Sequence, residues 1–81
     1  MENFEEIANN KEQRAMSIIG DIYLNGLGIE QSNFIAATWY LKASYRYYEL
    51  GNQDSALLQL EKSLRAVPDY NAALEWKKII M

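Results

Sequence analysis

Carboxylates are the side chains of this 81-residue sequence with the most evident capacity for chemistry. Two carboxylates at a suitable distance can act as a general acid and a general base, and the candidate pairs are Glu5 with Glu6 and Asp21 with Glu30. Acidic residues near the start of a helix also interact favourably with its dipole, so these pairs need no catalytic role. The sequence has no histidine and no cysteine, on which most proton relays, nucleophiles and zinc sites depend. We therefore predict that the protein is not an enzyme and binds no metal or cofactor.

Two short motifs have only a weak likeness to ligand-binding sequences. Gly26 and Gly28 are spaced like the start of a nucleotide-binding loop, but no third glycine and no Lys-Ser or Lys-Thr pair follows them, so we interpret them as turn residues. Lys77 and Lys78 complement the dipole at the end of a helix. Eight Lys and Arg residues against eleven Asp and Glu residues give a net charge of −3, which argues against a nucleic-acid partner and against an anionic membrane surface.

The spacing of apolar residues predicts a chain made of helices. In the first segment apolar residues recur at the i, i+3, i+4, i+7, i+8 positions that form one face of a helix. The Asn9-Asn10 pair is a candidate break that would leave a short leading helix, and Gly26 is the expected end of the main one. The face consists of Ala15, Ile18, Ile19, Ile22 and Tyr23, and it is extended toward the N-terminus by Phe4, Ile7 and Ala8.

The second helix is predicted from about residue 33 to residue 50, after an N-cap at Ser32, and it is apolar around most of its circumference. A helix with a narrow polar face must be surrounded by other elements, so we expect it to be central. Its polar stripe consists of Thr38, Lys42, Arg46 and Glu49. Its first apolar sector contains Ala36, Trp39, Tyr40, Ala43, Tyr47 and Leu50, and its second contains Phe34, Ala37, Leu41, Tyr45 and Tyr48.

Two further helices complete the predicted fold. The third helix is expected to have Asn52 or Asp54 as its N-cap and to end before Pro68, the only proline of the sequence. Asp69 is the expected N-cap of the last helix. Glu61 and Arg65 have the i, i+4 spacing of a helical ion pair. Short connections make neighbouring helices antiparallel. The predicted fold class is therefore all-α, an antiparallel stack of α-hairpins with four main helices.

Small and aromatic residues alternate along the first two helices at a regular spacing. Together with a few aliphatic and basic residues they form the pattern Ala15, Ile19-Gly20, Tyr23, Gly26, Gly28-Ile29, Ala36, Trp39-Tyr40 and Lys42-Ala43-Ser44. In these residues the sequence resembles the Sel-like branch of the tetratricopeptide repeats, although Ser32 and Ile35 stand where that family usually has Asp and Lys. The resemblance implies stacked helical hairpins and work as an adaptor, chaperone or scaffold, mostly in bacteria. Signature residues of this kind are packing residues, so they specify a fold more than a function.

The second half is similar to the end of an ordinary tetratricopeptide repeat. The matching residues are Gly51, Ala56, Leu60, Ser63-Leu64 and Pro68. The resemblance implies about two repeats in a single domain over residues 1–81, with a core repeat at 15–50 and a second hairpin and cap at 53–80. The register stays open, because the second helix fits both the closing helix of the first repeat and the opening helix of the second.

The second apolar sector of the central helix is the candidate partner site. We name this sector (Phe34, Ala37, Leu41, Tyr45 and Tyr48) the aromatic strip. Either the first and last helices cover it, or it forms a groove or dimer seam in which Tyr45 and Tyr48 are anchors, bordered by Lys42, Arg46 and Glu49. An apolar or helical peptide fits it better than a carboxylate tail does. The predicted partner-binding residues are Phe34, Leu41, Tyr45, Tyr48 and Glu49.

The expected function is protein–protein interaction, with another protein or a peptide as the partner. One alternative is a small immunity or inhibitor protein that covers a basic site on a toxin or enzyme, and a second is a structural homodimer. The acidic N-terminus lacks the order of a secretory signal, and no apolar run is long enough to cross a membrane, so we expect a cytoplasmic location.

Overall fold

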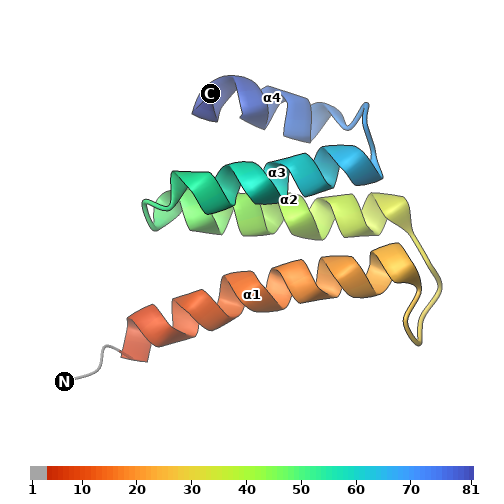
Figure 1. Cartoon of the computed structure of the whole chain (residues 1–81), viewed down its shortest axis with the longest axis horizontal. Helices are drawn as coiled ribbons and strands as arrows, with labels where there is room; N and C mark the ends of the chain where they lie inside the picture. Colours follow the sequence, from red (N-terminus) through yellow and green to blue (C-terminus); the bar gives the residue numbers. More distant parts are fainter. Residues whose placement is uncertain (1–3) are drawn as a thin grey trace.

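The computed structural model describes the backbone of residues 4–81 and the side chains of residues 13–81. Consecutive helices run in opposite directions, and α2 and α3 overlap in the middle of the view, with α1 on one side and α4 on the other (Figure 1). The predicted all-α stack of antiparallel hairpins is thus confirmed. The helices are α1 (Phe4–Asn25), α2 (Asn33–Glu49), α3 (Gln53–Ala66) and α4 (Asn71–Ile80).

The helices form a thin slab, which measures 41 × 34 × 14 Å between Cα atoms. Packed helices have axes about 9 Å apart, and each helix adds a Cα radius of about 2.3 Å on either side. The shortest dimension therefore corresponds to two layers of helices. None of the described helices is both long and apolar enough to cross a lipid bilayer.

Helix α1 is continuous from Phe4 to Asn25, so the break expected at Asn9-Asn10 is wrong. Asparagine lowers helix stability by only about 0.6 kcal/mol relative to alanine, whereas a break would leave backbone groups without partners. The predicted apolar extension over Phe4, Ile7 and Ala8, together with the Glu5–Glu6 pair, concerns side chains outside the described ones.

The connection between α1 and α2 follows the predicted cap chemistry. Gly26 has a φ of 68°, a left-handed conformation that glycine adopts without steric cost, and α1 ends there. Ser32 is the N-cap of α2, and its hydroxyl accepts a 3.2 Å hydrogen bond from the backbone N–H of Ile35. Asn52 rather than Asp54 caps α3, since its side chain accepts from the N–H of Ser55 at 3.1 Å.

Helix α4 begins one residue later than expected, because Tyr70 and not Asp69 occupies the N-cap position. Pro68 and Asp69 are the two central residues of a turn closed by a 3.1 Å hydrogen bond from the N–H of Tyr70 to the carbonyl of Val67. Proline and aspartate are well suited to such a turn. The turn thus includes the residue that the sequence pattern assigned to the cap, and α4 has no side-chain N-cap.

Helix α2 is central, as predicted, since α1 and α3 both pack extensively against it. Its first apolar sector meets α1 through Tyr40, and its second meets α3 and α4 through Leu41. The expectation that α1 helps to cover the second sector is therefore replaced by coverage from α3 and α4. The buried core cluster consists of Leu41, Ala56, Leu60, Ala73 and Ile80.

Three side-chain hydrogen bonds fix the register of α2 against the C-terminal hairpin, which consists of α3 and α4. The Ser63 hydroxyl donates to the carbonyl of Ala37 at 2.8 Å, and the Ser44 hydroxyl donates to the carbonyl of Ala56 at 2.7 Å. The indole N–H of Trp76 in α4 donates to the same Ser44 oxygen at 2.9 Å. Because both serines are fully buried, losing such a bond would leave a polar group without a partner.

Candidate functional site

Tyr40 lies where α1, α2 and α3 meet, and only 1% of it is exposed. A Cβ on Gly20 of α1 would lie 2.8 Å from Cε1 of the Tyr40 ring, closer than carbon atoms approach each other, so a glycine at this position lets the ring pack against the α1 backbone. The Tyr40 hydroxyl donates a hydrogen bond to the carboxylate of Asp21. These contacts hold Tyr40 as the floor between α1 and α3.

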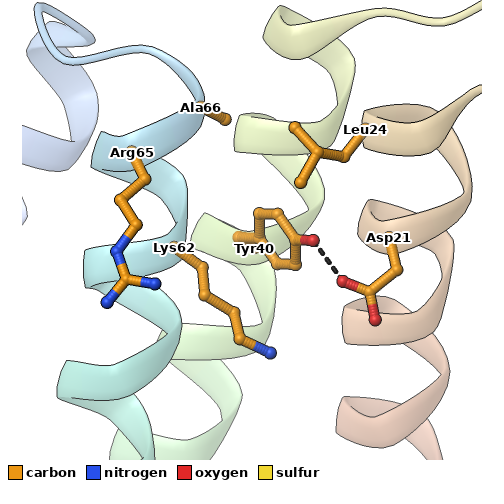
Figure 2. Close-up of a pocket in the computed structure, with 6 residues that line it drawn as sticks. All are labelled: Asp21, Leu24, Tyr40, Lys62, Arg65 and Ala66. Atoms are coloured by element: carbon orange, nitrogen blue, oxygen red, sulfur yellow. Dashed lines mark hydrogen bonds between the residues drawn. The ribbon is translucent and has the colours of Figure 1, made fainter.

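A pocket of about 220 Å³ opens beside this tyrosine. Figure 2 shows Lys62 extending from α3 below Tyr40 toward α1, while Asp21 points from α1 to the tyrosine hydroxyl. We name this pocket the α1–α3 groove. Its lining residues are Asp21 and Leu24 from α1, Tyr40 from α2, and Lys62, Arg65 and Ala66 from α3.

The size of the α1–α3 groove bears on what it can hold. Pockets that bind small molecules usually enclose about 300–1,000 Å³, and this one is smaller. Its lining combines Tyr40, Leu24 and Ala66 with three charged residues, Asp21, Lys62 and Arg65. Such a shape suits one or two side chains of a protein segment better than a whole metabolite.

The charges around the α1–α3 groove are unevenly distributed. The Lys62 ammonium lies 5.6 Å from the centroid of the Tyr40 ring, within the range of a cation–π contact. Among the side chains that the structure describes, Glu61 and Arg65 do not form the expected ion pair. Arg46 and Glu49, near the end of α2, form an exposed ion pair at 3.7 Å. Arg65 is exposed, and water solvates its charge well enough that pairing offers little gain.

Burial raises the pKa of the Tyr40 hydroxyl well above its usual range, and the hydrogen bond to Asp21 and the charge of that carboxylate raise it further. The hydroxyl therefore stays protonated and keeps donating to Asp21 at physiological pH. This bond orients the two side chains toward each other.

Tyr40→Phe is expected to flatten the decline of stability in alkali. Tyrosine in the unfolded chain ionises near pH 10, whereas the folded chain resists ionisation at Tyr40, so this residue's contribution is complete below about pH 10 and is lost as pH rises beyond it. Tyr45, whose pKa burial also raises, is present in both proteins and cancels. Urea unfolding at a series of pH values measures the difference. Parallel declines in the two proteins would contradict this result.

The structure places the predicted partner-binding residues over and beside the C-terminal hairpin. Leu41 is only 4% exposed and belongs to the core, so it is not accessible to a partner. Phe34 is 60% exposed, and its ring lies 5.4 Å from that of Tyr70. Tyr45 and Tyr48, about two-fifths exposed, meet the Trp76 ring nearly at right angles, at 4.7 and 5.2 Å.

The C-terminal hairpin therefore covers the middle of the aromatic strip and leaves its edges exposed. Glu49 is exposed at the end of α2, where it pairs with Arg46, and Lys42 lies 4.5 Å from the centroid of the Trp39 ring. Contact of Phe34, Tyr45, Tyr48 and Glu49 with a partner stays a prediction.

Sequence reasoning missed Lys62 and Arg65 as members of a site. Their i, i+3 spacing places two cations on one face of α3, a signal that is visible in the sequence. What the sequence does not reveal is that this face borders Asp21 and Leu24, about forty residues earlier. The Asp21 carboxylate is hydrogen-bonded to Tyr40 and does not pair with Glu30. Among the described residues no group of three or more acidic side chains is arranged to hold a metal ion.

The chain was compared with known proteins, and it matched no protein-family model, no curated protein and no solved structure.

Proposed function

We propose that the protein is a non-catalytic interaction module of the adaptor, chaperone or scaffold type, acting in the cytoplasm. It docks a segment of another protein in the α1–α3 groove. The observation that carries this proposal is the groove itself, a pocket of about 220 Å³ between three helices whose floor, Tyr40, is buried and hydrogen-bonded. A rigid floor lowers the entropy that binding costs.

The resemblance to Sel-like repeats supports the same proposal. Gly20 and Tyr40 contact each other, and Ala36 and Ala43 are fully buried. These are packing positions of the family pattern, so the residues that carry the resemblance are the ones that join α1 to α2. Proteins built from stacked helical hairpins bind partners along the surface that adjacent hairpins create.

A selection from a random dodecapeptide library tests this function. The folded chain is expected to enrich peptides that bind the wild type and bind Ala66→Trp at least tenfold more weakly, a loss of about 1.4 kcal/mol. Ala66 lines the groove, so an indole there occupies the space of the ligand. Ala15→Trp is the matched control, because Ala15 is exposed on α1 and does not line the groove.

Circular dichroism and thermal unfolding establish first that both variants keep the wild-type fold. Failure to enrich any peptide would contradict the proposal, as would peptides that bind Ala66→Trp and the wild type equally well. Peptides lost equally with Ala15→Trp and Ala66→Trp would also count against the groove, since only Ala66 lines it.

A further inference from the structure

Positive charge gathers in the C-terminal part of this acidic chain. Residues 62–81 carry four Lys and Arg residues against two Asp and Glu residues, although the whole chain has a net charge of −3. The remaining part, residues 1–61, is accordingly acidic. The excess begins at Lys62, because α3 and α4 taken together (residues 53–81) have four Lys and Arg residues against four Asp and Glu residues. A partner that approaches α3 at Lys62 and Arg65 therefore meets a local charge whose sign differs from that of the whole protein.

The α1–α3 groove lies at the edge of this positive region. Lys62 and Arg65 both line it from α3, one helical turn apart. Arg65 also lines an open depression on the other flank of α3, together with Lys77. Among the described side chains neither Lys62 nor Arg65 forms an ion pair, and the contact of Lys62 with the Tyr40 ring leaves its charge unneutralised.

The α1–α3 groove has one negative charge in its lining against two positive ones. Asp21 is the carboxylate, and its Oδ1 atom accepts the hydrogen bond from the Tyr40 hydroxyl. A basic ligand would meet the two cations of α3, which outnumber this carboxylate. An acidic ligand meets those cations directly, and Asp21 repels it from the α1 side and so fixes its orientation.

We propose that the α1–α3 groove binds an acidic segment of a partner protein in which an Asp or Glu side chain lies beside an aliphatic one. This inference rests on the function proposed above. The carboxylate binds against α3, where Lys62 extends toward α1 and Arg65 lies one helical turn away (Figure 2). The aliphatic side chain packs between Leu24 and Ala66, which form the apolar part of the lining above the buried Tyr40. Charge complementarity selects the partner, and the apolar contact fixes its position.

The amino-acid composition of the peptides enriched in the dodecapeptide selection tests the inference. Groove-dependent peptides, meaning those lost in Ala66→Trp, are expected to share an Asp or Glu adjacent to Leu, Ile or Val. A selected peptide in which this acid is replaced by its amide is expected to bind at least tenfold more weakly in fluorescence anisotropy. Its affinity should also fall as salt rises, because salt screens the charges.

Charge reversal supplies the matched comparison. The double variant Lys62→Glu with Arg65→Glu is expected to lose the acidic peptides at least tenfold. Arg14→Glu with Lys78→Glu changes the net charge by the same amount at exposed residues that do not line the groove and is expected to keep them. Equal losses in the two double variants would overturn the inference, since attraction would then be a property of net charge alone.

The outcomes separate this inference from the proposed function. Groove-dependent peptides that lack an acidic residue would overturn the inference and leave the interaction module intact. Groove-dependent peptides rich in Lys and Arg would also overturn it, and they would favour the alternative of an inhibitor for a basic site. Absence of any groove-dependent peptide would contradict the proposed function itself.

Discussion

Leu60→Ala is expected to lower the free energy of unfolding by about 2–5 kcal/mol. Leu60 is 2% exposed and packs in the cluster that joins α2, α3 and α4. Its truncation removes buried apolar surface and leaves a cavity that the helices fill only in part. Domains of this size have about 5–15 kcal/mol of total stability, so the expected loss is a large fraction of that free energy.

Leu58→Ala is the matched control, because Leu58 lies on the same helix and is 48% exposed. Its expected cost is less than about 1 kcal/mol, as for most surface substitutions. Urea unfolding followed by circular dichroism compares the two variants with the wild type. If the two substitutions cost the same, the orientation of α3 described here is wrong.

Trp76→Ala is expected to cost about 3 kcal/mol, the low end of the range for large aromatic core residues, because Trp76 is only partly buried. The substitution removes two edge-on contacts, with Tyr45 and Tyr48, each worth about 0.5–1.5 kcal/mol beyond the buried area. It also removes the indole donor to Ser44. Trp76→Phe retains a ring and is expected to cost about 1 kcal/mol, chiefly for the lost hydrogen bond.

Leu74→Ala controls for α4 itself, since Leu74 lies on the same helix, is 37% exposed and does not belong to the core cluster. Urea unfolding followed by far-ultraviolet circular dichroism measures all three variants without relying on tryptophan fluorescence. A loss for Trp76→Ala no larger than that for Leu74→Ala would mean that the aromatic strip does not hold α4.

Local sequence signals predicted the helices and their connections well. Periodic apolar residues identify a helical face because the helix repeats every 3.6 residues, and Ser32 and Gly26 act on backbone groups within a few residues of themselves. The N-cap of α4 was misassigned because Pro68 and Asp69 suit a turn as well as a cap, and only the folded chain decides between them.

Tertiary arrangement could not be predicted in the same way. A helical wheel shows that α2 has two apolar sectors, but it does not show which neighbour each sector meets. The α1–α3 groove is also a product of packing, because Leu24 and Arg65 become neighbours only when α1 and α3 both lie against α2.

The burial of two glutamines could not be predicted from the spacing of apolar residues. Gln13 is fully buried and Gln59 is 5% exposed, positions that a polar residue rarely occupies. Among the residues that the structure describes, both side-chain polar atoms of Gln13 and the Oε1 atom of Gln59 have no hydrogen-bond partner. Periodicity assigns such residues to the surface, so their burial follows from the packing of neighbouring helices and not from their own chemistry.

The limited packing of α4 against α3 affects how the folded chain opens locally. Helix α4 packs against α3 less extensively than α2 does, and its Trp76 contacts two tyrosine rings and one serine hydroxyl. Regions with few buried contacts open at the lowest free-energy cost. Leu41 packs with Ala73 and Ile80 of α4, and Tyr45 and Tyr48 contact its Trp76, whereas no residue of α4 lines the α1–α3 groove. Local opening of α4 is therefore expected to expose further apolar surface on α2 and to leave the groove in place.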